Sequence, residues 1–534
     1  MILVVIAVLS VFSWYSVVLP GVRPRLYDVL ERNSAVVPQR QDVNQASSRS
    51  QHPIQTLAEK AIFDFQATID RQSRTLDAAV AQYRIRYRRS PPPGFARWFT
   101  FAQRHHSRII DDYDSIAKAM EPFWQQSPAR SKELVEQVSE RGSLHAFSVS
   151  NGTFDFGEDN WMGEEIARTL ADVVQDLPEL QLITNSLDEP MVVSPATETK
   201  QHVQLFDDGN AQPSWAVISG SCRDAPKQVQ PYQTGPSTFP GGLPFVANTA
   251  EMRDLCRHPE YEHMHGFFVS PTSLEYTTEN IPIWSQAAPS TFRDIVYPSP
   301  WYWTHIDEEL EERDVPWQSK TNDLYWAGTT TGGHSAHSRW NQHHRQRFIA
   351  TTSQLLNKSV TFLTESTPGH WQTYQSRDIL AQLYNTKFTG LSQCDDVECE
   401  AQAAYFHVGK SEPFQNAYKS RFVMDVDGNS FSGRYYNLLS SQSVVLKQTI
   451  FREWHDERLF PWLHYVPVSL QMEELPEIMR YLALTKDGGV IAKTIADKSR
   501  AWARTALRRE DAAVYMYRLL LEYARVMSDD REDD

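Results

Sequence analysis

The segment 421–439, RFVMDVDGNSFSGRYYNLL, combines acidic, small polar and basic side chains after an apolar run. Its two aspartates and Asn429 have the spacing of the first three ligands of a calcium-binding loop. The glycine that such a loop needs at its sixth position falls at the fourth, as Gly428, and Tyr436 stands where the bidentate glutamate should be. The spacing therefore argues against calcium.

The same segment has the order expected of an anion-binding loop. RFVMDV predicts a strand, DGNSFSG a loop and RYYNLLS the start of a helix. Glycines and small side chains expose backbone N–H groups at a helix N-terminus, and Arg434 could add a bidentate phosphate contact. No G-K-[ST] follows, so this is not a Walker motif. A diphosphate cradle and an ordinary strand–turn–helix both stay open.

A second segment that could carry chemistry is 322–348, NDLYWAGTTTGGHSAHSRWNQHHRQRF. LYWAG predicts a strand that runs into threonines, paired glycines and then a basic helix. The hydroxyls and guanidinium groups that could meet an anion belong to Thr329, Thr330, Thr331, Arg339, Arg345 and Arg347. The histidines His337, His343 and His344 could suggest a metal. Their spacing is not that of a standard ligand set, and a helix face beside an anion explains them as well.

The third segment is 182–193, LITNSLDEPMVV, which predicts a buried strand ending at Asn185. Asp188 and Glu189 follow at the carboxyl end of that strand, and Pro190 restricts the loop. In α/β folds ligands bind beyond the carboxyl ends of the strands, so a carboxylate here could act as a general base. A lone aspartate in such a place is more often a turn former, and both interpretations stand.

The elements that must position these residues belong to a chain too long for one core. Its 534 residues, 41% of them hydrophobic, indicate two globular domains with appendages. The net charge of −15 argues against nucleic acid as a partner, because phosphate binding needs a basic surface.

Helical periodicity and the alternation of helix and strand predict an α/β protein with two Rossmann-like domains and parallel sheets. PSWAVISG, residues 213–220, is one of the predicted strands. The predicted segments are a membrane anchor (1–20), a polar stem linker (21–55), a helical N-terminal extension (56–140), a first Rossmann-like domain (141–310), a second (311–505), and a C-terminal helix with an acidic tail (506–534).

The N-terminal run MILVVIAVLSVFSWYSVVLPG is apolar and barely long enough to cross a bilayer. We favour an uncleaved signal anchor over a cleaved signal peptide, because no basic region precedes the run and no clear small-x-small cleavage site follows it. Arg23 and Arg25 make the orientation ambiguous by charge. Glycosylation sequons at Asn151 and Asn357 favour a lumenal main part, as in a type II protein of the Golgi or ER membrane.

The four cysteines, Cys222, Cys256, Cys394 and Cys399, allow three pairings. We favour the two local disulfides, Cys222 with Cys256 and Cys394 with Cys399, because the second pair closes the short loop CDDVEC. A zinc site is the alternative, but C-x4-C without a second nearby pair disfavours it.

The order of five motifs resembles one family. N-x-x-D-E-P, FRDIVYPSPWYW, YWAGTTTGG with HRQRF, RFVMDVDGNSFSGRYYNLL and REWHDERLFPWLHYVPV occur in the order found in the capsule-associated glycosyltransferases, glycosyltransferase family ninety. That family also includes the animal protein O-glucosyltransferases of the Rumi type. The resemblance covers roughly residues 150 to 525, and the chain looks like the fungal branch.

The resemblance implies a GT-B fold, in which two Rossmann-like domains face a cleft, and an inverting transfer of sugar from a UDP-sugar to a hydroxyl. Asp188 matches the catalytic base. The residues implied on the UDP-sugar side are Thr329, Arg339, Arg345, Asn429, Ser430, Ser432, Gly433 and Arg434, with Ser432 and Arg434 the best matched. Tyr297, Trp301 and Trp303 lie in the segment implied on the acceptor side.

The resemblance also leaves choices open. Many relatives have an arginine where this chain has Ala327, so a binding protein without catalytic activity is the alternative function. A glycoside hydrolase is disfavoured because it has no diphosphate to hold. UDP-xylose is the first choice of donor and UDP-glucose the second, with a glycan, polysaccharide or glycoprotein as acceptor. No cofactor is required if Arg434 and loop N–H groups stabilise the leaving UDP, and a divalent metal is left as an alternative.

Overall fold

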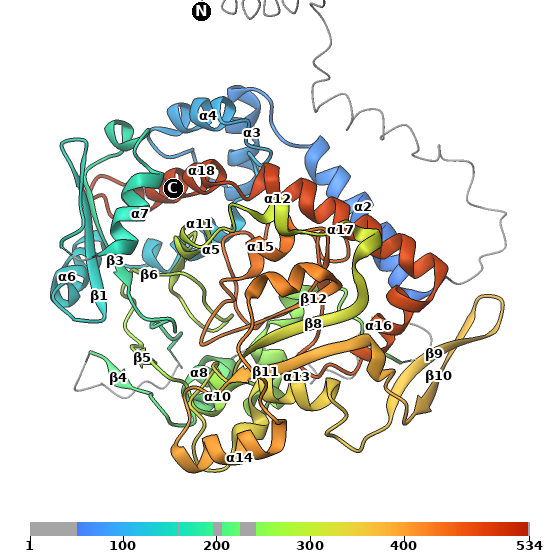
Figure 1. Ribbon diagram of the computed structural model, residues 1–534. Helices are drawn as coiled ribbons and strands as arrows, with labels where there is room; N and C mark the ends of the chain where they lie inside the picture. Colours follow the sequence, from blue (N-terminus) through green and yellow to red (C-terminus); the bar gives the residue numbers. More distant parts are fainter. Residues whose placement is uncertain (1–50, 159, 196–204, 225–241, 532–534) are drawn as a thin grey trace, which may run out of the picture. The chain divides into compact units, whose positions relative to one another are not determined.

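The computed structural model describes residues 51–158, 160–195, 205–224 and 242–531 (Figure 1). The predicted anchor, residues 1–20, and most of the predicted stem lie outside the described residues. None of the helices formed by the described residues is both long and apolar enough to cross a membrane.

The described residues form two five-stranded sheets, and the second of them carries the loop 427–434. All its neighbouring strands are parallel, and residues of β12 and β13 are almost completely buried, as expected for a sheet covered on both faces. Its order is β11 (Tyr384–Gly390), β8 (Thr321–Thr329), β12 (Ser420–Val426), β13 (Val444–Gln448) and β14 (Val466–Pro467).

The first sheet carries Asp188 beyond the end of β3. It is mixed: β1 runs antiparallel to β2 and β3, whereas β3, β6 and β7 are parallel. Its order is β2 (Thr153–Asp155), β1 (Leu144–Ser150), β3 (Leu180–Asn185), β6 (Ile283–Ser285) and β7 (Ile295–Val296). The α/β class and the parallel sheet are therefore confirmed, and the GT-B arrangement stays a prediction.

Among the described residues, two short antiparallel ribbons lie outside these sheets. One pairs β9 (Val360–Thr367) with β10 (His370–Ser376), and the other pairs β4 (Asp207–Asp208) with β5 (Glu275–Tyr276). The predicted strand at 213–220 is wrong, because Trp215–Ile218 form the short helix α8. The backbone N–H groups of Val217 and Ile218 bond back to the Ser214 carbonyl, and only one side chain of α8 is buried, so this apolar run lacks the alternating burial of a strand.

Helices surround both sheets (Figure 1). Those before β1 are α2 (Pro53–Asp70), α3 (Leu76–Tyr87), α4 (Phe95–Arg104), α5 (Asp114–Trp124) and α6 (Pro128–Val138). Those between β1 and β8 are α7 (Trp161–Thr169), α8, α9 (Thr249–Met252), α10 (Gly266–Val269), α11 (Trp301–Thr304) and α12 (Leu310–Arg313). The rest are α13 (His344–Thr352), α14 (Asp396–Phe406), α15 (Tyr435–Ser440), α16 (Leu475–Leu484), α17 (Lys486–Ala506) and α18 (Arg509–Val526).

The first and last helices of the described chain pack together. In Figure 1, α3 and α4 lie beside the C-terminal helix α18, and α18 also contacts α5. The Trp98 indole of α4, fully buried, donates to the Val514 carbonyl of α18 at 2.9 Å. Burial of such aromatic side chains stabilises the packing of the N-terminal helices against the rest of the fold.

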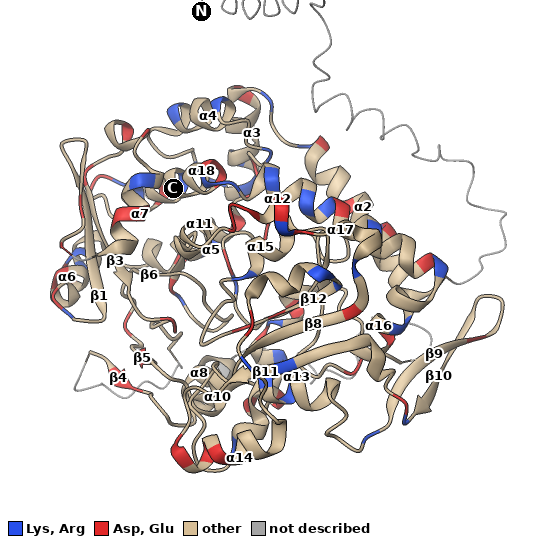
Figure 2. Ribbon diagram, viewed as in Figure 1, with Lys and Arg blue, Asp and Glu red and all other residues tan. Residues whose placement is uncertain are grey.

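Acidic and basic positions are interspersed along the helices that flank both sheets (Figure 2). On α17, for example, lysines and arginines alternate with Asp487 and Asp497.

Candidate active site

The NSLDEP loop after β3 presents Asp188 by fixing the residues on either side of it. The buried Asn185 accepts from the Leu187 N–H at 2.9 Å and donates to the Glu189 carbonyl at 2.7 Å, which closes the turn. The Glu189 carboxylate, fully buried, accepts from the backbone N–H groups of Thr272 and Ser273 at 2.8 and 2.5 Å. Burial raises the pKa of Glu189 to about 7. Asp188 is exposed, so it is the one acidic residue of this loop that can meet a substrate.

Asn429 joins the loops of the two sheets. Its amide nitrogen donates to Asp188 Oδ2 at 3.1 Å, across a separation of 241 residues. Its amide oxygen accepts from the Gly332 N–H at 3.2 Å and from the Thr272 hydroxyl at 3.4 Å. We call Asp188, Thr272, Gly332 and Asn429 the loop junction. All three segments that the sequence analysis singled out, 182–193, 322–348 and 421–439, therefore meet at one point.

Arg345 holds the loop after β8 against the loop after β12. The guanidinium donates through Nε to the Asp427 carbonyl at 2.7 Å and through Nη1 to the Thr329 carbonyl at 3.1 Å and the Thr331 hydroxyl at 2.5 Å. Burial lowers the pKa of Arg345 to about 9, so the group is still charged at neutral pH. The next residue along, Gly332, has φ +104°, a left-handed conformation that glycine tolerates.

A buried charge network lies behind the loop 429–434. The Ser432 hydroxyl donates to Asp425 Oδ1 at 2.5 Å, and Lys447 contacts the other oxygen of Asp425 at 2.7 Å. Lys447 also lies 3.6 Å from Glu453, which accepts from the Tyr302 hydroxyl. Burial raises the pKa of Glu453 to about 7. Ser432 is thus turned toward the protein interior, which fixes the backbone of the loop.

Arg434 borders a cavity of about 230 Å³ at the carboxyl end of β8. Its guanidinium donates to the Ala327 carbonyl at 2.8 Å and lies 5.5 Å from the centre of the Trp326 ring. We call this the β8 cavity; its lining includes Tyr325, Ala327, Gly328, Thr329, Glu412 and Arg434. The Tyr325 hydroxyl donates to Glu412 at 2.7 Å. The cavity therefore combines a cation, a carboxylate and hydroxyl groups with aromatic and apolar walls.

The predicted acceptor-side residues lie in different surroundings. Tyr297 is fully buried, and the half-buried Trp303 packs near Trp454. Trp301 is 40% exposed and stacks on His305 with ring centres 3.6 Å apart. A Cβ built on Gly433 would lie 2.2 Å from the Trp301 indole nitrogen, so Trp301 packs directly on the loop 429–434. Of the three, only Trp301 is both exposed and adjacent to that loop.

The remaining predicted residues are less directly involved. The Arg339 side chain has no hydrogen bond or ion pair with the described residues, and Ser430 is buried with its carbonyl accepting from the Gly428 N–H. His343 and His344 are buried, and His337 is exposed. No group of three His, Cys, Asp or Glu side chains placed to hold a metal occurs among the described residues.

Two participants were missed by sequence reasoning. Thr272 reaches Asn429 from a loop without a recognisable motif, and Glu412 enters the β8 cavity from the segment GKSEPF. Neither stretch has a spacing or composition that indicates chemistry, so the sequence held no signal for them.

Both predicted disulfides are confirmed. Cys222 pairs with Cys256, with Cα atoms 5.0 Å apart, and Cys394 pairs with Cys399 at 5.4 Å. The sequon residues Asn151 and Asn357 are both exposed in loops, where glycosylation is sterically feasible.

Parts of the chain are similar to a known protein family and to several known proteins. A family model described as Glycosyl transferase family 90 matches residues 269–532. Protein O-glucosyltransferase 3 of Rattus norvegicus is 27% identical over 245 residues, 46% of this chain. Protein O-glucosyltransferase 2 of Danio rerio is 30% identical over 126 residues, 23% of the chain, and Protein O-glucosyltransferase 1 of Homo sapiens 22% over 295 residues, 51% of the chain.

These matches show that the chain is related to glycosyl transferase family 90, which confirms the relationship predicted from the motif order, and the fungal branch stays a prediction. The matched parts are 42%, 25% and 64% of the three relatives, so the chain spans less than two thirds of their length. The family match includes the loops after β8 and β12 but begins after Asp188. The family match therefore does not test the catalytic role predicted for Asp188, which stays a prediction.

Proposed function

We propose that the protein is an inverting glycosyltransferase that moves a sugar from a UDP-sugar to a hydroxyl group. The observation that carries the proposal is the hydrogen bond from Asn429 to Asp188. It places an exposed carboxylate from the first sheet against the loop of the second sheet that has the features of a diphosphate cradle. Inversion needs this pairing, with a base on one face of the sugar and a stabilised leaving group on the other.

In the proposed reaction, Asp188 takes the proton of the acceptor hydroxyl as its oxygen bonds to the anomeric carbon. The bond from that carbon to the UDP oxygen breaks, and UDP leaves with the electron pair. Arg434 and the N–H groups of the loop 429–434 stabilise the negative charge that grows on the diphosphate. Arg345 acts as a positioning residue, because its donors hold the backbone of both loops.

The β8 cavity is the proposed site of the nucleoside. Glu412 could accept from ribose hydroxyls, and the walls provided by Tyr325 and Ala327 could cover the base. Thr329 lines the cavity, and a few residues further along the chain Gly332 belongs to the loop junction. A nucleotide there would have its diphosphate near Arg434 and its sugar toward Asp188.

The proposed donors are UDP-xylose first and UDP-glucose second, and the proposed acceptor is a glycan, polysaccharide or glycoprotein. Two disulfides and two exposed sequons support a compartment of the secretory pathway, where disulfides form and persist. We retain anchoring to the Golgi or ER membrane in type II orientation as part of this proposal.

The test is to incubate the purified chain with a panel of UDP-sugars and measure UDP release with and without saccharide acceptors. Turnover of one pentosyl or hexosyl donor is expected, and no turnover of any donor would refute the transferase. Ala327 motivates the second candidate, a binding protein without catalysis. UDP binding without turnover, unchanged by Asp188→Asn, would favour that candidate.

A further inference from the structure

A cavity of about 260 Å³ lies between the N-terminal helices α3 and α5 and the C-terminal helix α18. We call it the α18 cavity. It shares no residue with the loop junction or the β8 cavity. Its charged and aromatic lining includes Arg89, Trp124, Arg518, Glu522 and Arg525.

Arg518 is the unusual group of this cavity. It is 3% exposed and is surrounded by the rings of Tyr83, Phe95, Trp98 and Tyr113, whose centres are between 4.7 and 5.5 Å from the guanidinium carbon. Arg518 donates through Nε to Glu522 at 2.9 Å. Its two terminal nitrogens have no hydrogen-bond partner among the described residues. A buried guanidinium with free donors facing a cavity is a site for an acceptor group.

The cavity also holds more positive than negative charge. Glu522 is shared by two cations, because Arg525 contacts its second oxygen at 2.7 Å, and Arg525 Nε is buried without a partner. Arg89 lies over the Trp124 ring at 4.1 Å and forms no ion pair with the described residues. Lys118 and Glu121, also in the lining, add one charge of each sign and leave the balance unchanged. Three arginines against one glutamate leave a surplus of two positive charges.

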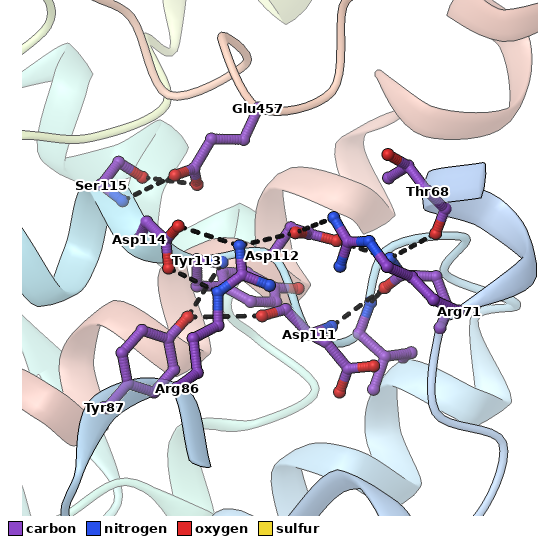
Figure 3. A network of polar contacts seen from close by, with 12 residues as sticks. Thr68, Arg71, Arg86, Tyr87, Asp111, Asp112, Tyr113, Asp114, Ser115 and Glu457 are labelled. Carbon is purple, nitrogen blue, oxygen red and sulfur yellow. Dashed lines mark hydrogen bonds and ion pairs between the residues drawn. The ribbon is translucent and has the colours of Figure 1, made fainter. Parts of the chain in front are cut away.

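Arg86, which is also on α3 but does not line the cavity, shows the contrast. Its guanidinium contacts Asp112 at 2.8 Å and Asp114 at 2.6 Å, and Glu457 binds Ser115 beside them (Figure 3). The charge of Arg86 is thus neutralised by two carboxylates of the chain. In the α18 cavity a single carboxylate, that of Glu522, serves both Arg518 and Arg525, so the positive charge is only partly neutralised, and an incompletely neutralised buried charge is costly.

We propose that the α18 cavity binds a small anion with a carboxylate or phosphate group, held by Arg518 and Arg89. The cavity volume of about 260 Å³ is just below the usual range of ligand sites, about 300–1,000 Å³, so the anion is small and has room for a single ring at most. Bound there, it links the N-terminal helices to α18 and stabilises the folded chain by mass action. This inference does not depend on the proposed transferase activity.

The test is a titration of the full chain with inorganic phosphate and with glucuronate, against sodium chloride at matched ionic strength. Thermal unfolding and calorimetry are the readouts. A saturable rise in melting temperature with phosphate alone, glucuronate alone or both, beyond that with chloride, supports the site and identifies the anionic group. No rise beyond that with chloride overturns it.

Three variants locate the binding. Arg89→Gln, at the edge of the cavity, should weaken anion binding about tenfold or more, as expected for loss of one charge-assisted contact. Arg84→Gln is the control, because Arg84 is exposed on α3, shortly before Arg89 in the sequence, and does not line the cavity. Arg434→Gln should leave anion binding intact. Anion binding that is lost in Arg434→Gln but unchanged in Arg89→Gln would assign the anion to the diphosphate loop and overturn the inference.

Discussion

Replacing Gly328 by alanine should displace Arg434 without touching its charge. A Cβ built on Gly328 would lie 2.7 Å from Arg434 Nη2 and 2.8 Å from the edge of the Trp326 ring, closer than any tolerated contact. The Arg434 side chain is the flexible partner, so it should move and lose its 2.8 Å bond to the Ala327 carbonyl. The guanidinium would then no longer be held where the proposal puts the diphosphate.

The size of the effect on UDP binding follows from the loss of the proposed hydrogen bond between Arg434 and the diphosphate. A hydrogen bond to a charged group contributes about 1.5–3 kcal/mol, which corresponds to about a 10- to 100-fold rise in the Kd of UDP. Crowding against the buried Trp326 should also cost about 1–3 kcal/mol of folding stability, so the variant is expected to fold. Calorimetric titration with UDP measures the first effect and thermal unfolding the second.

Two further variants test whether the loss of UDP affinity comes from displacement of Arg434. Gly409→Ala is the matched control, because its added Cβ would have nearest neighbours at 3.5 and 3.6 Å, which are ordinary contacts. In an Arg434→Gln background, Gly328→Ala should cause no further loss of UDP affinity, because both changes remove the same contact. Wild-type UDP affinity in Gly328→Ala, or additive losses in the double variant, would refute the reasoning.

The remaining predictions concern stability. Burial raises the pKa of Glu453 to about 7 from about 4.5, so between these pH values the folded protein retains a proton that the unfolded chain releases. The free energy of unfolding should therefore fall as pH rises through this interval, by at most about 1.4 kcal/mol per pH unit from this group. Glu453→Gln should flatten that part of the profile in urea unfolding at each pH; an unchanged slope would contradict the assignment. Removing Cys222–Cys256, which closes a 34-residue separation, should cost about 4 kcal/mol, against about 2 kcal/mol for Cys394–Cys399. Denaturation of serine variants would measure both losses, and equal costs would count against the loop-entropy argument.

Secondary structure could be predicted from the sequence where residues close together in the chain determine it. RFVMDV is β12, the glycines and serines form the loop, and RYYNLLS opens α15, because apolar and turn-forming residues change at those positions. The run at 213–220 is apolar but isolated, and without a neighbouring strand to pair with it becomes the helix α8. Among the described residues, the apolar start of β9 pairs with β10 in a separate ribbon and does not join either five-stranded sheet.

The active-site geometry could be predicted only in part. Asp188 and Asn429 were each singled out, but their contact spans 241 residues and depends on how the two sheets are placed. The direction of individual side chains could not be predicted either. Ser432 belongs to the predicted loop, yet its hydroxyl turns inward to Asp425. Tyr297 and Trp301 are four residues apart in one aromatic segment, and only the fold decides that the first is buried and the second exposed.

The most direct test of the proposed function is the rate of sugar transfer by Asp188→Asn. Asparagine is isosteric and can still accept the hydrogen bond from Asn429, so the loop junction should stay intact. We expect UDP affinity and thermal stability to match the wild type, while kcat falls by about 10²- to 10⁴-fold through loss of the general base. Transfer at the wild-type rate by this variant would contradict the assignment of Asp188 as the catalytic base.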